Sequence, residues 1–266
     1  MTKFEKDVEN FIKLLSEFPN ENDKKVLNNV FNPWKDYDAS HDFDESSPQK
    51  RCCNLYKYLK AREKAEYILI AEAPGYQGCH FSGIPMTSER LILTNNAYGL
   101  EGLERTSDYR EQNNKLAEAK IYTTKYPNGR NIAKTVIKNG FAEPTATIVW
   151  KQMVDELDIK PTDFVLWNAF PFHPHDINKK LSNRKPTPDE LSKTNDILKN
   201  FVKLYPNAYY ISIGEVSKKT LQEIKNTKIN YIADDKHSVV HPSYGNANKF
   251  REQIADIINY VKLKTN

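Results

Sequence analysis

The stretch "YILIAEAPGYQGCHFSGIPM", residues 67–86, places a loop rich in glycine and proline directly behind a continuous apolar run. An apolar run without alternation suits a strand that is buried on both faces, as in a parallel sheet. Pro74 fixes its own φ and Gly75 carries no side chain, so the backbone at the strand end can approach a flat ligand closely. Taken alone, the loop is more typical of a structural turn than of a binding site.

Strand-length apolar runs recur along the chain and alternate with helical patterns. Strand followed by helix is the pattern of an α/β fold. We therefore predict a three-layer α/β/α sandwich around a small, mainly parallel four-stranded sheet. The expected strands lie in 67–73, 163–170, 208–215 and, more weakly, 237–242, and the expected helices lie at 4–15, 87–100, 188–203, 215–226 and 246–263.

The 266 residues are expected to form a single domain. It would begin with a helical segment, 1–64, and contain a polar, weakly periodic insertion at about 101–145. We interpret that insertion as helical or as a flap over one edge of the sheet. Internal repeats and low-complexity tracts are absent from the sequence.

Composition restricts the function only loosely. The chain has 39 basic and 35 acidic residues, a net charge of +4 and a pI near 8.7, so contact with nucleic acid would have to rest on local basic character. Three cysteines cannot supply a four-cysteine cluster. Because no signal-peptide core and no apolar run of about 20 residues is present, we expect a reduced, cytoplasmic protein that is soluble and monomeric.

Two further loops stand at expected strand ends. "WNAFPFHPH" (167–175) places Asn168 at the end of an apolar run, and "VVHPSYGNANKF" (239–250) does the same for His241. In open parallel sheets, ligands bind outside the carboxyl ends of the strands. An Asn amide presents one acceptor and two donors, which suits the edge of a base, and a His can donate to an oxygen that gains negative charge.

Each of these signals has an ordinary structural alternative. Asn168 alone is as compatible with a buried amide that ties loops together, and a lone His such as His241 more often caps a strand than acts in chemistry. Their order, and their placement at three strand ends, make them specific as a set.

This set resembles the uracil-DNA glycosylase superfamily, whose first motif is a Gly-x-x-Pro-type loop and whose second is His-Pro-Ser near the C-terminus. The wording "EAPG…GIPM" is most similar to the branch that carries Gly-Glu-Ala-Pro-Gly, and the resemblance runs over about 65–263. It implies a monofunctional DNA glycosylase that flips out uracil or a related pyrimidine and hydrolyses its N-glycosidic bond, as in base excision repair of DNA damage.

The resemblance also implies roles for individual residues. Asn168 would read the base and His241 would steady the departing base. Ser243 would hold a phosphate, and Tyr244, from its position alone, would be the wedge that fills the vacated stack. The substrate-binding residues would be Ala73, Pro74, Gly75, Tyr76, Phe81, Met86 and Asn168, and the DNA-binding residues Ser243, Tyr244, Asn246, Lys179 and Lys180, the last two in the basic loop 173–188.

The sequence departs from the family pattern at several positions. Met86 stands where the family has a Phe stacked on the base, with Phe81 as a nearby substitute. Ala73 stands where other branches place an Asp or Asn that positions water, so Glu72 is the candidate catalytic carboxylate. The iron–sulfur cysteines of the branch are absent, so we expect no cluster, no other cofactor and no metal.

The identity of the base is open at this point. Gly75 occupies a position where the strictest uracil enzymes of the family have a Tyr that excludes substituents at C5, so a 5-substituted pyrimidine fits unless Tyr76 or the insertion fills the space. The Asn168 amide, turned over, would also match cytosine. The alternative substrate is therefore a 5-modified pyrimidine of foreign (phage) DNA.

Two other classes of protein are compatible with parts of the sequence. One is a non-catalytic nucleic-acid-binding protein that kept the sheet and the basic loop. The other is a metal hydrolase, whose candidate ligands fit no standard zinc spacing. Those candidates are Cys79, His80, His173, His175 and His241.

Overall fold

The computed structural model describes residues 1–20, 23, 25–94, 98–104, 106, 136, 139–224, 230, 231 and 238–265. It confirms an α/β fold in which a small parallel sheet is flanked by helices. The four-stranded sheet has the order β3-β2-β5-β6, and each of its three pairings is parallel. Its strands are β2 (Tyr67–Ala71), β3 (Phe164–Asn168), β5 (Tyr209–Ser212) and β6 (Asn230–Tyr231).

The weak fourth strand lies elsewhere than the sequence pattern predicted. The position beside β5 is taken by β6, while the run 237–242 contributes a single parallel bridge between Val239 and Ile213. Of this run, residue 237 lies outside the described residues. Proline at position 242 cannot donate to a ladder, which is one reason why a strand does not continue there.

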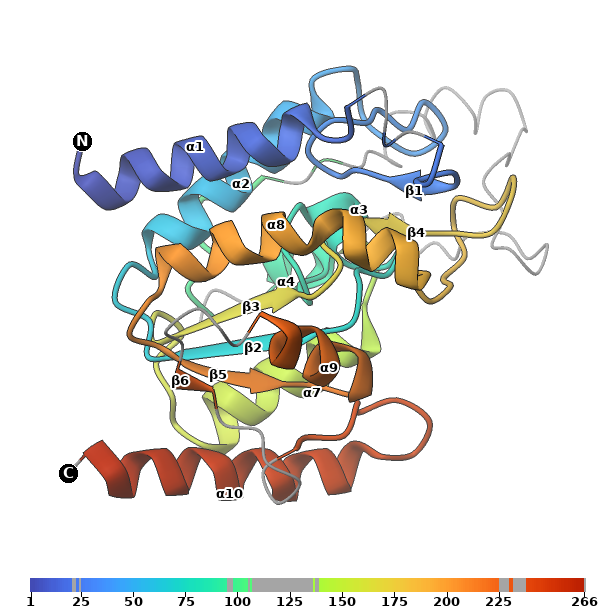
Figure 1. Ribbon diagram of the computed structural model, residues 1–266. Helices are drawn as coiled ribbons and strands as arrows, with labels where there is room; N and C mark the ends of the chain where they lie inside the picture. Colours follow the sequence, from blue (N-terminus) through green and yellow to red (C-terminus); the bar gives the residue numbers. More distant parts are fainter. Residues whose placement is uncertain are drawn as a thin grey trace.

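Helices cover both faces of the sheet. In Figure 1, α1, α2 and α8 lie on one side of the strands, and α7 and α10 lie on the other. A two-stranded antiparallel pair, β1 with β4, lies near the edge where the parallel strands end. The remaining bounds are α1 (Lys3–Glu17), β1 (Val30–Phe31), α2 (Ser47–Lys60), α3 (Cys79–Ser82), α4 (Glu89–Thr94), α7 (Pro144–Trp150), the π-helical turn η2 (Lys151–Glu156), β4 (His173–Pro174), α8 (Pro188–Leu204), α9 (Glu215–Glu223) and α10 (Ala247–Thr265).

Local sequence explains where the long helices begin. Thr2 and Glu5 form a reciprocal capping box at the start of α1, and Thr187 and Glu190 form another at the start of α8. Pro188 at the first position of α8 removes a donor that would have no partner there. The expected helix 87–100 is shorter, since α4 ends at Thr94 and residues 95–97 are not described.

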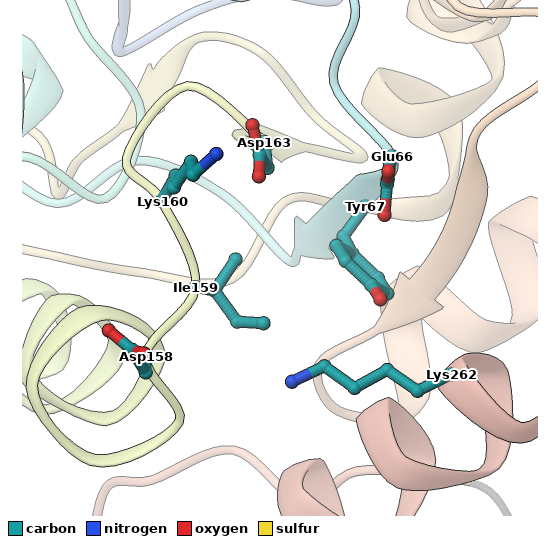
Figure 2. Close-up of a pocket in the computed structure, with 7 residues that line it drawn as sticks. All are labelled: Glu66, Tyr67, Asp158, Ile159, Lys160, Asp163 and Lys262. Carbon is teal, nitrogen blue, oxygen red and sulfur yellow. The ribbon is translucent and has the colours of Figure 1, made fainter.

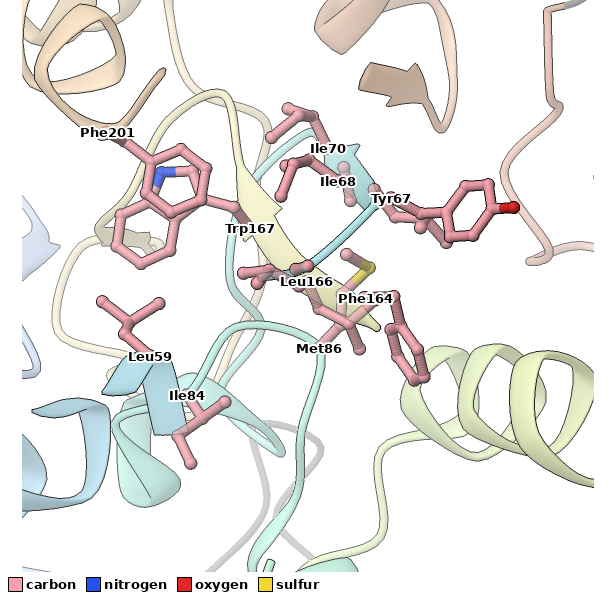
Figure 3. Packing of buried hydrophobic residues seen from close by; sticks show 14 of the residues in the cluster. Leu59, Tyr67, Ile68, Ile70, Ile84, Met86, Phe164, Leu166, Trp167 and Phe201 are labelled. Atoms are coloured by element: carbon pink, nitrogen blue, oxygen red, sulfur yellow. The ribbon is translucent and has the colours of Figure 1, made fainter. Parts of the chain in front are cut away.

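The core explains why β2 and β3 read as unbroken apolar runs. Every residue of both strands is buried. The Trp167 ring stacks on Phe201 of α8 at a centroid distance of 4.4 Å, and Met86 and Leu166 lie close together among these core residues (Figure 3). Helices therefore cover both faces of each strand, so the ends of the strands are the part of the sheet that a ligand can reach.

The polar insertion expected at about 101–145 lies mostly outside the described residues. Of the described part, Phe141 is fully buried and joins a small second cluster with Phe81, Val136 and Leu181. This cluster lies beside the loop that follows β2.

Candidate functional site at the carboxyl edge of the sheet

The first two loops meet through backbone hydrogen bonds. Ala71 and Asn168 are register partners at the ends of β2 and β3. Beyond them, the Ala169 N–H donates to the Ala71 carbonyl at 2.8 Å, and the Phe170 N–H donates to the Glu72 carbonyl at 3.0 Å. The glycine-proline loop and the Asn168 side chain therefore start from the same point of the sheet edge.

The third loop reaches the same edge through β5. Gly214, which follows β5, donates its N–H to the Val239 carbonyl at 2.8 Å. A Cβ built on Gly214 would lie 3.7 Å from the Cβ of His241. Because β5 pairs with β2, His241 is placed one strand away from the glycine-proline loop, on the side opposite β3.

Asn168 is the most unusual polar residue of this edge. Its side chain is fully buried, and neither Oδ1 nor Nδ2 has a hydrogen-bond partner. Leaving a buried polar group unpaired costs about 1–3 kcal/mol. A fully buried amide at a strand end is therefore ready to accept one hydrogen bond and donate two, which is the equipment that reads the edge of a base.

His241 is held as a hydrogen-bond donor. Its Nδ1 accepts from the Ser243 backbone N–H at 3.3 Å and lies 2.8 Å from the Ser243 hydroxyl. Burial, with a smaller effect of Lys185, lowers the pKa of the imidazole below its ordinary value, which favours the neutral ring. With Nδ1 accepting, the single ring proton is on Nε2, which is free to donate to a ligand.

Glu72 is a half-buried carboxylate next to the end of β2. Burial raises its pKa above the ordinary value, and the positive charge of Lys185 partly opposes that rise. The positive charge of Lys185 thus acts on the pKa of both Glu72 and His241. From the sequence, Lys185 was one of the basic residues of the loop 173–188 considered for phosphate contact, and its effect on Glu72 and His241 was not predicted.

The space beside Gly75 is occupied by an amide. The Tyr76 N–H donates to Asn183 Oδ1 at 2.9 Å. A Cβ on Gly75 would lie 3.3 Å from Asn183 Nδ2 and 3.4 Å from its Oδ1. Asn183 was not predicted from the sequence, and its position next to "APGY" depends on a contact between loops that are more than a hundred residues apart.

A second buried carboxyl also escaped prediction. Glu143 precedes α7, and its Oε2 is buried without a partner against Gly78, where an added Cβ would lie only 1.9 Å away. Burial raises the pKa of Glu143 to about 7. Gly78 therefore carries no side chain because this carboxyl occupies the space.

The candidate stacking residues are both buried. Met86 is 3% exposed, and its carbonyl accepts from the Trp150 indole N–H at 3.2 Å. Phe81 is fully buried, and its ring stacks on Phe141 at 5.3 Å. Of the other expected substrate-binding residues, Pro74 is buried and Ala73, Gly75 and Tyr76 are half-buried, with the Tyr76 ring edge-on to Phe141.

The residues expected to contact DNA lie on the surface. Tyr244 is fully exposed at 100%, on a left-handed backbone with φ 55°. Asn246, Lys179 and Lys180 are exposed and Ser243 is half-buried. The Lys180 ammonium also pairs with Asp38 Oδ1 at 3.4 Å, so part of its charge is used within the protein.

A series of buried, hydrogen-bonded polar side chains lies beneath the basic loop 173–188. His173 Nε2 donates to the Ser182 carbonyl at 2.8 Å, and its Nδ1 lies 2.9 Å from Nδ1 of His80. His80 Nε2 in turn lies 3.3 Å from Asp38 Oδ2. Among the residues that the structure describes, no group of three or more His, Cys, Asp or Glu side chains is arranged to hold a metal ion.

A polar cavity of about 340 Å³ lies at the opposite, amino-terminal edge of the sheet. Figure 2 shows the side chains around it, which come from the start of β2, from the segment 158–163 that precedes β3, and from α10. Tyr67 is the first residue of β2, whereas Ala71 at the other end marks the candidate site. This cavity is therefore separate from the edge where Asn168 and His241 lie.

The fold is an α/β fold with a parallel sheet, and the carboxyl edge of that sheet bears the unpaired buried amide of Asn168 and the imidazole of His241. The chain belongs to the uracil-DNA glycosylase superfamily, since residues 60–262 match the family described as "Uracil DNA glycosylase superfamily". This membership implies a DNA glycosylase that acts on uracil-like bases in DNA. No curated protein sequence is significantly similar to the chain.

A solved structure shares the fold. The crystal structure of wild-type SMUG2 from Pedobacter heparinus matches with a TM-score of 0.58 at 16% sequence identity, over 98% of this chain and 99% of that chain. Among the helices of the described residues, none combines the length and the apolar character that crossing a bilayer requires.

Proposed function

We propose that the protein is a monofunctional glycosylase that removes uracil from DNA. The observation that carries this proposal is the buried Asn168 amide, which has no partner for either of its polar atoms. Its Oδ1 complements N3–H of uracil and its Nδ2 complements O4. A flipped uracil would supply the hydrogen bonds that the folded protein leaves unmade.

His241 would stabilise the departing base. Cleavage of the N-glycosidic bond leaves its electron pair on the pyrimidine and an oxocarbenium-like sugar. A neutral imidazole whose Nε2 carries the proton can donate to the pyrimidine oxygen as negative charge develops there. A donor fixed beforehand by Ser243 avoids reorganisation during the reaction.

Glu72 would complete the hydrolysis. The water oxygen bonds to the sugar C1′, and the proton that water loses passes to the Glu72 carboxylate. A carboxylate with a raised pKa is a better proton acceptor than an ordinary Glu. Glu72 would thus take the role of positioning and deprotonating the attacking water, which Ala73 cannot perform because it has no functional group.

The surface residues would hold the strand. Ser243 and Asn246 lie before α10 and are suited to a phosphate, because the N-terminus of a helix favours negative charge. Lys179 and the partly engaged Lys180 would add phosphate contacts from the basic loop. Tyr244, exposed at the tip of its turn, would enter the stack and offset the few kcal/mol that unstacking costs.

The decisive experiment measures base release. Purified protein is incubated with oligonucleotides that carry uracil, mismatched thymine, hypoxanthine or 5-hydroxymethylcytosine, and abasic sites are then cleaved with alkali. We expect cleavage at uracil, the same yield with a chelator, and none with Asn168→Leu. Salt-sensitive DNA binding without release of any base would instead identify a non-catalytic binder and refute the proposal.

A 5-modified pyrimidine is the second candidate substrate, because the space beside Gly75 is taken by the short Asn183 amide and not by a side chain of residue 75. The same set of oligonucleotides ranks the two, since 5-hydroxymethylcytosine and thymine differ from their parent bases at C5. Faster release of a 5-substituted base than of uracil would make that base the substrate.

A further inference from the structure

The absence of a side chain at Gly75 leaves a space that another loop fills. The three atoms of Asn183 nearest to a Cβ built on Gly75 are Nδ2 at 3.3 Å, Oδ1 at 3.4 Å and Cγ at 3.6 Å. Because Nδ2 and Oδ1 are both nearer than Cγ, the polar end of the Asn183 amide is the part directed at the glycine. A Cβ at position 75 would require this amide to shift by a few tenths of an ångström.

The orientation of the amide is fixed. Because Oδ1 accepts the Tyr76 N–H at 2.9 Å, the oxygen and nitrogen of Asn183 cannot be exchanged without losing that bond. The rest of the residue is exposed to solvent, and its side chain also interacts with buried His173. Tyr76, which could have filled the same space, instead turns its ring to Phe141.

The backbone on both sides of Asn183 is anchored. The Ser182 carbonyl accepts from buried His173 at 2.8 Å. Arg184 makes a bidentate pair with Glu190 at 2.6 and 2.8 Å and also donates to the His175 carbonyl at 3.0 Å. A short side chain between two anchored neighbours has little room to swing away, which suits a wall better than a mobile flap.

We infer that Asn183 is the specificity-determining residue of the site and that its amide excludes substituents at C5 of the base. This inference rests on the proposed function, because it requires a pyrimidine held between Asn168 and the loop at Gly75. It also explains how a protein with a bare glycine at this position would still prefer uracil to thymine.

The test compares excision of uracil and of thymine, each opposite guanine, by single-turnover kinetics. For Asn183→Ala we expect the thymine-to-uracil ratio of kcat/KM to rise at least about tenfold, the usual discrimination for one methyl group in a pocket. Asn183→Asp keeps the shape and the acceptor for Tyr76, so its ratio should stay within about twofold of the wild type, whatever happens to the absolute rate.

Ile177→Ala is the matched control, because Ile177 lies in the same loop and is 70% exposed. It should leave both rates unchanged. An unchanged ratio in a folded Asn183→Ala variant that still excises uracil would overturn the inference and leave the glycosylase proposal intact. A wild-type protein that releases no base at all would overturn both, and a urea unfolding curve of each variant identifies a folding defect.

Discussion

Ala71 and Asn168 face each other as register partners at the ends of two parallel strands, so backbone hydrogen bonds fix the distance between the glycine-proline loop and the amide. Side-chain packing elsewhere can change without moving these two residues apart. Sheet pairing therefore positions the glycine-proline loop and Asn168 at the carboxyl edge of the sheet. His241 and Asn183 reach the same edge from loops.

Replacing Asn168 by Leu should abolish excision without weakening the fold. The unpaired amide is an energetic cost in the free protein, and an apolar residue of similar size removes that cost of about 1–3 kcal/mol. We expect a free energy of unfolding in urea equal to or above that of the wild type, together with a loss of at least about 10²-fold in kcat/KM.

Asn54→Leu is the matched control for this pair of measurements. Asn54 is also fully buried, but its amide makes three hydrogen bonds, to the carbonyls of Ser82 and Glu104 and from the Glu104 N–H. The same substitution there should destabilise the protein by more than about 2 kcal/mol, because it leaves the backbone groups of Ser82 and Glu104 without hydrogen-bond partners. Equal destabilisation at both positions would show that the Asn168 amide is satisfied.

His241→Ala should lower the single-turnover rate by about 10²–10³-fold, the usual cost of losing one preorganised donor. Ser243→Ala should cost less than about tenfold in that rate, because the Ser243 backbone N–H still holds Nδ1. KM for DNA should rise in the Ser243 variant if the hydroxyl also contacts a phosphate. A loss below about threefold in His241→Ala would remove His241 from the mechanism.

The rate of excision should increase with pH through the pKa of Glu72. The ionised carboxylate is the active form, and burial raises its pKa. The rising limb of the pH–rate profile should therefore lie at a higher pH than the ordinary pKa of a Glu side chain. Lys185 opposes that rise, so Lys185→Ala should move the limb to higher pH, and Glu72→Gln should remove it. A limb that stays in place in both variants would assign it to another group, such as the Glu143 carboxyl with its pKa of about 7.

Tyr244→Ala should affect duplex DNA more than single-stranded DNA. The fully exposed ring has no packing role in the fold, so the unfolding curve should not change. Excision of uracil from a duplex should fall, because the wedge no longer offsets the cost of unstacking, whereas excision from a single strand pays less of that cost. Equal effects on the two substrates would dismiss the wedge.

The buried pair of Asp42 and Arg51 should matter for stability. Both side chains are fully buried and are joined at 2.6 and 3.0 Å. Asp42→Asn removes the charge that compensates Arg51 and should destabilise the protein by about 3–5 kcal/mol in urea unfolding. Glu17→Gln, which breaks an exposed pair with Lys13, should change stability by less than about 1 kcal/mol.

The sequence predicted the layers well because they depend on periodicity. The unbroken runs at β2, β3 and β5 and the amphipathic faces of α1, α8 and α10 are local signals. The strand expected at 237–242 was reduced to the Val239 bridge, since a short apolar run says little about which neighbour completes the sheet. The carboxyl-edge placement of Asn168 and His241 followed from the α/β pattern alone.

The sequence did not reveal Asn183 or Glu143. Neither belongs to a periodic segment, and each acquires its position through a contact with the loop after β2. The only local hints were the bare Gly75 and Gly78, whose missing side chains leave space for the Asn183 amide and the Glu143 carboxyl. Which residue would fill either space depends on tertiary packing and has no local signal.

Asp38 lies before the segment 60–262 that matches the superfamily, yet its carboxylate contacts His80 and Lys180 inside that segment. The segment 1–59 therefore supports the loop 173–188 from outside the matched boundaries, through Asp38. A polypeptide shortened to the matched boundaries would keep the ends of β2, β3 and β5. It would lose the Asp38 carboxylate, which pairs with Lys180 in the 173–188 loop.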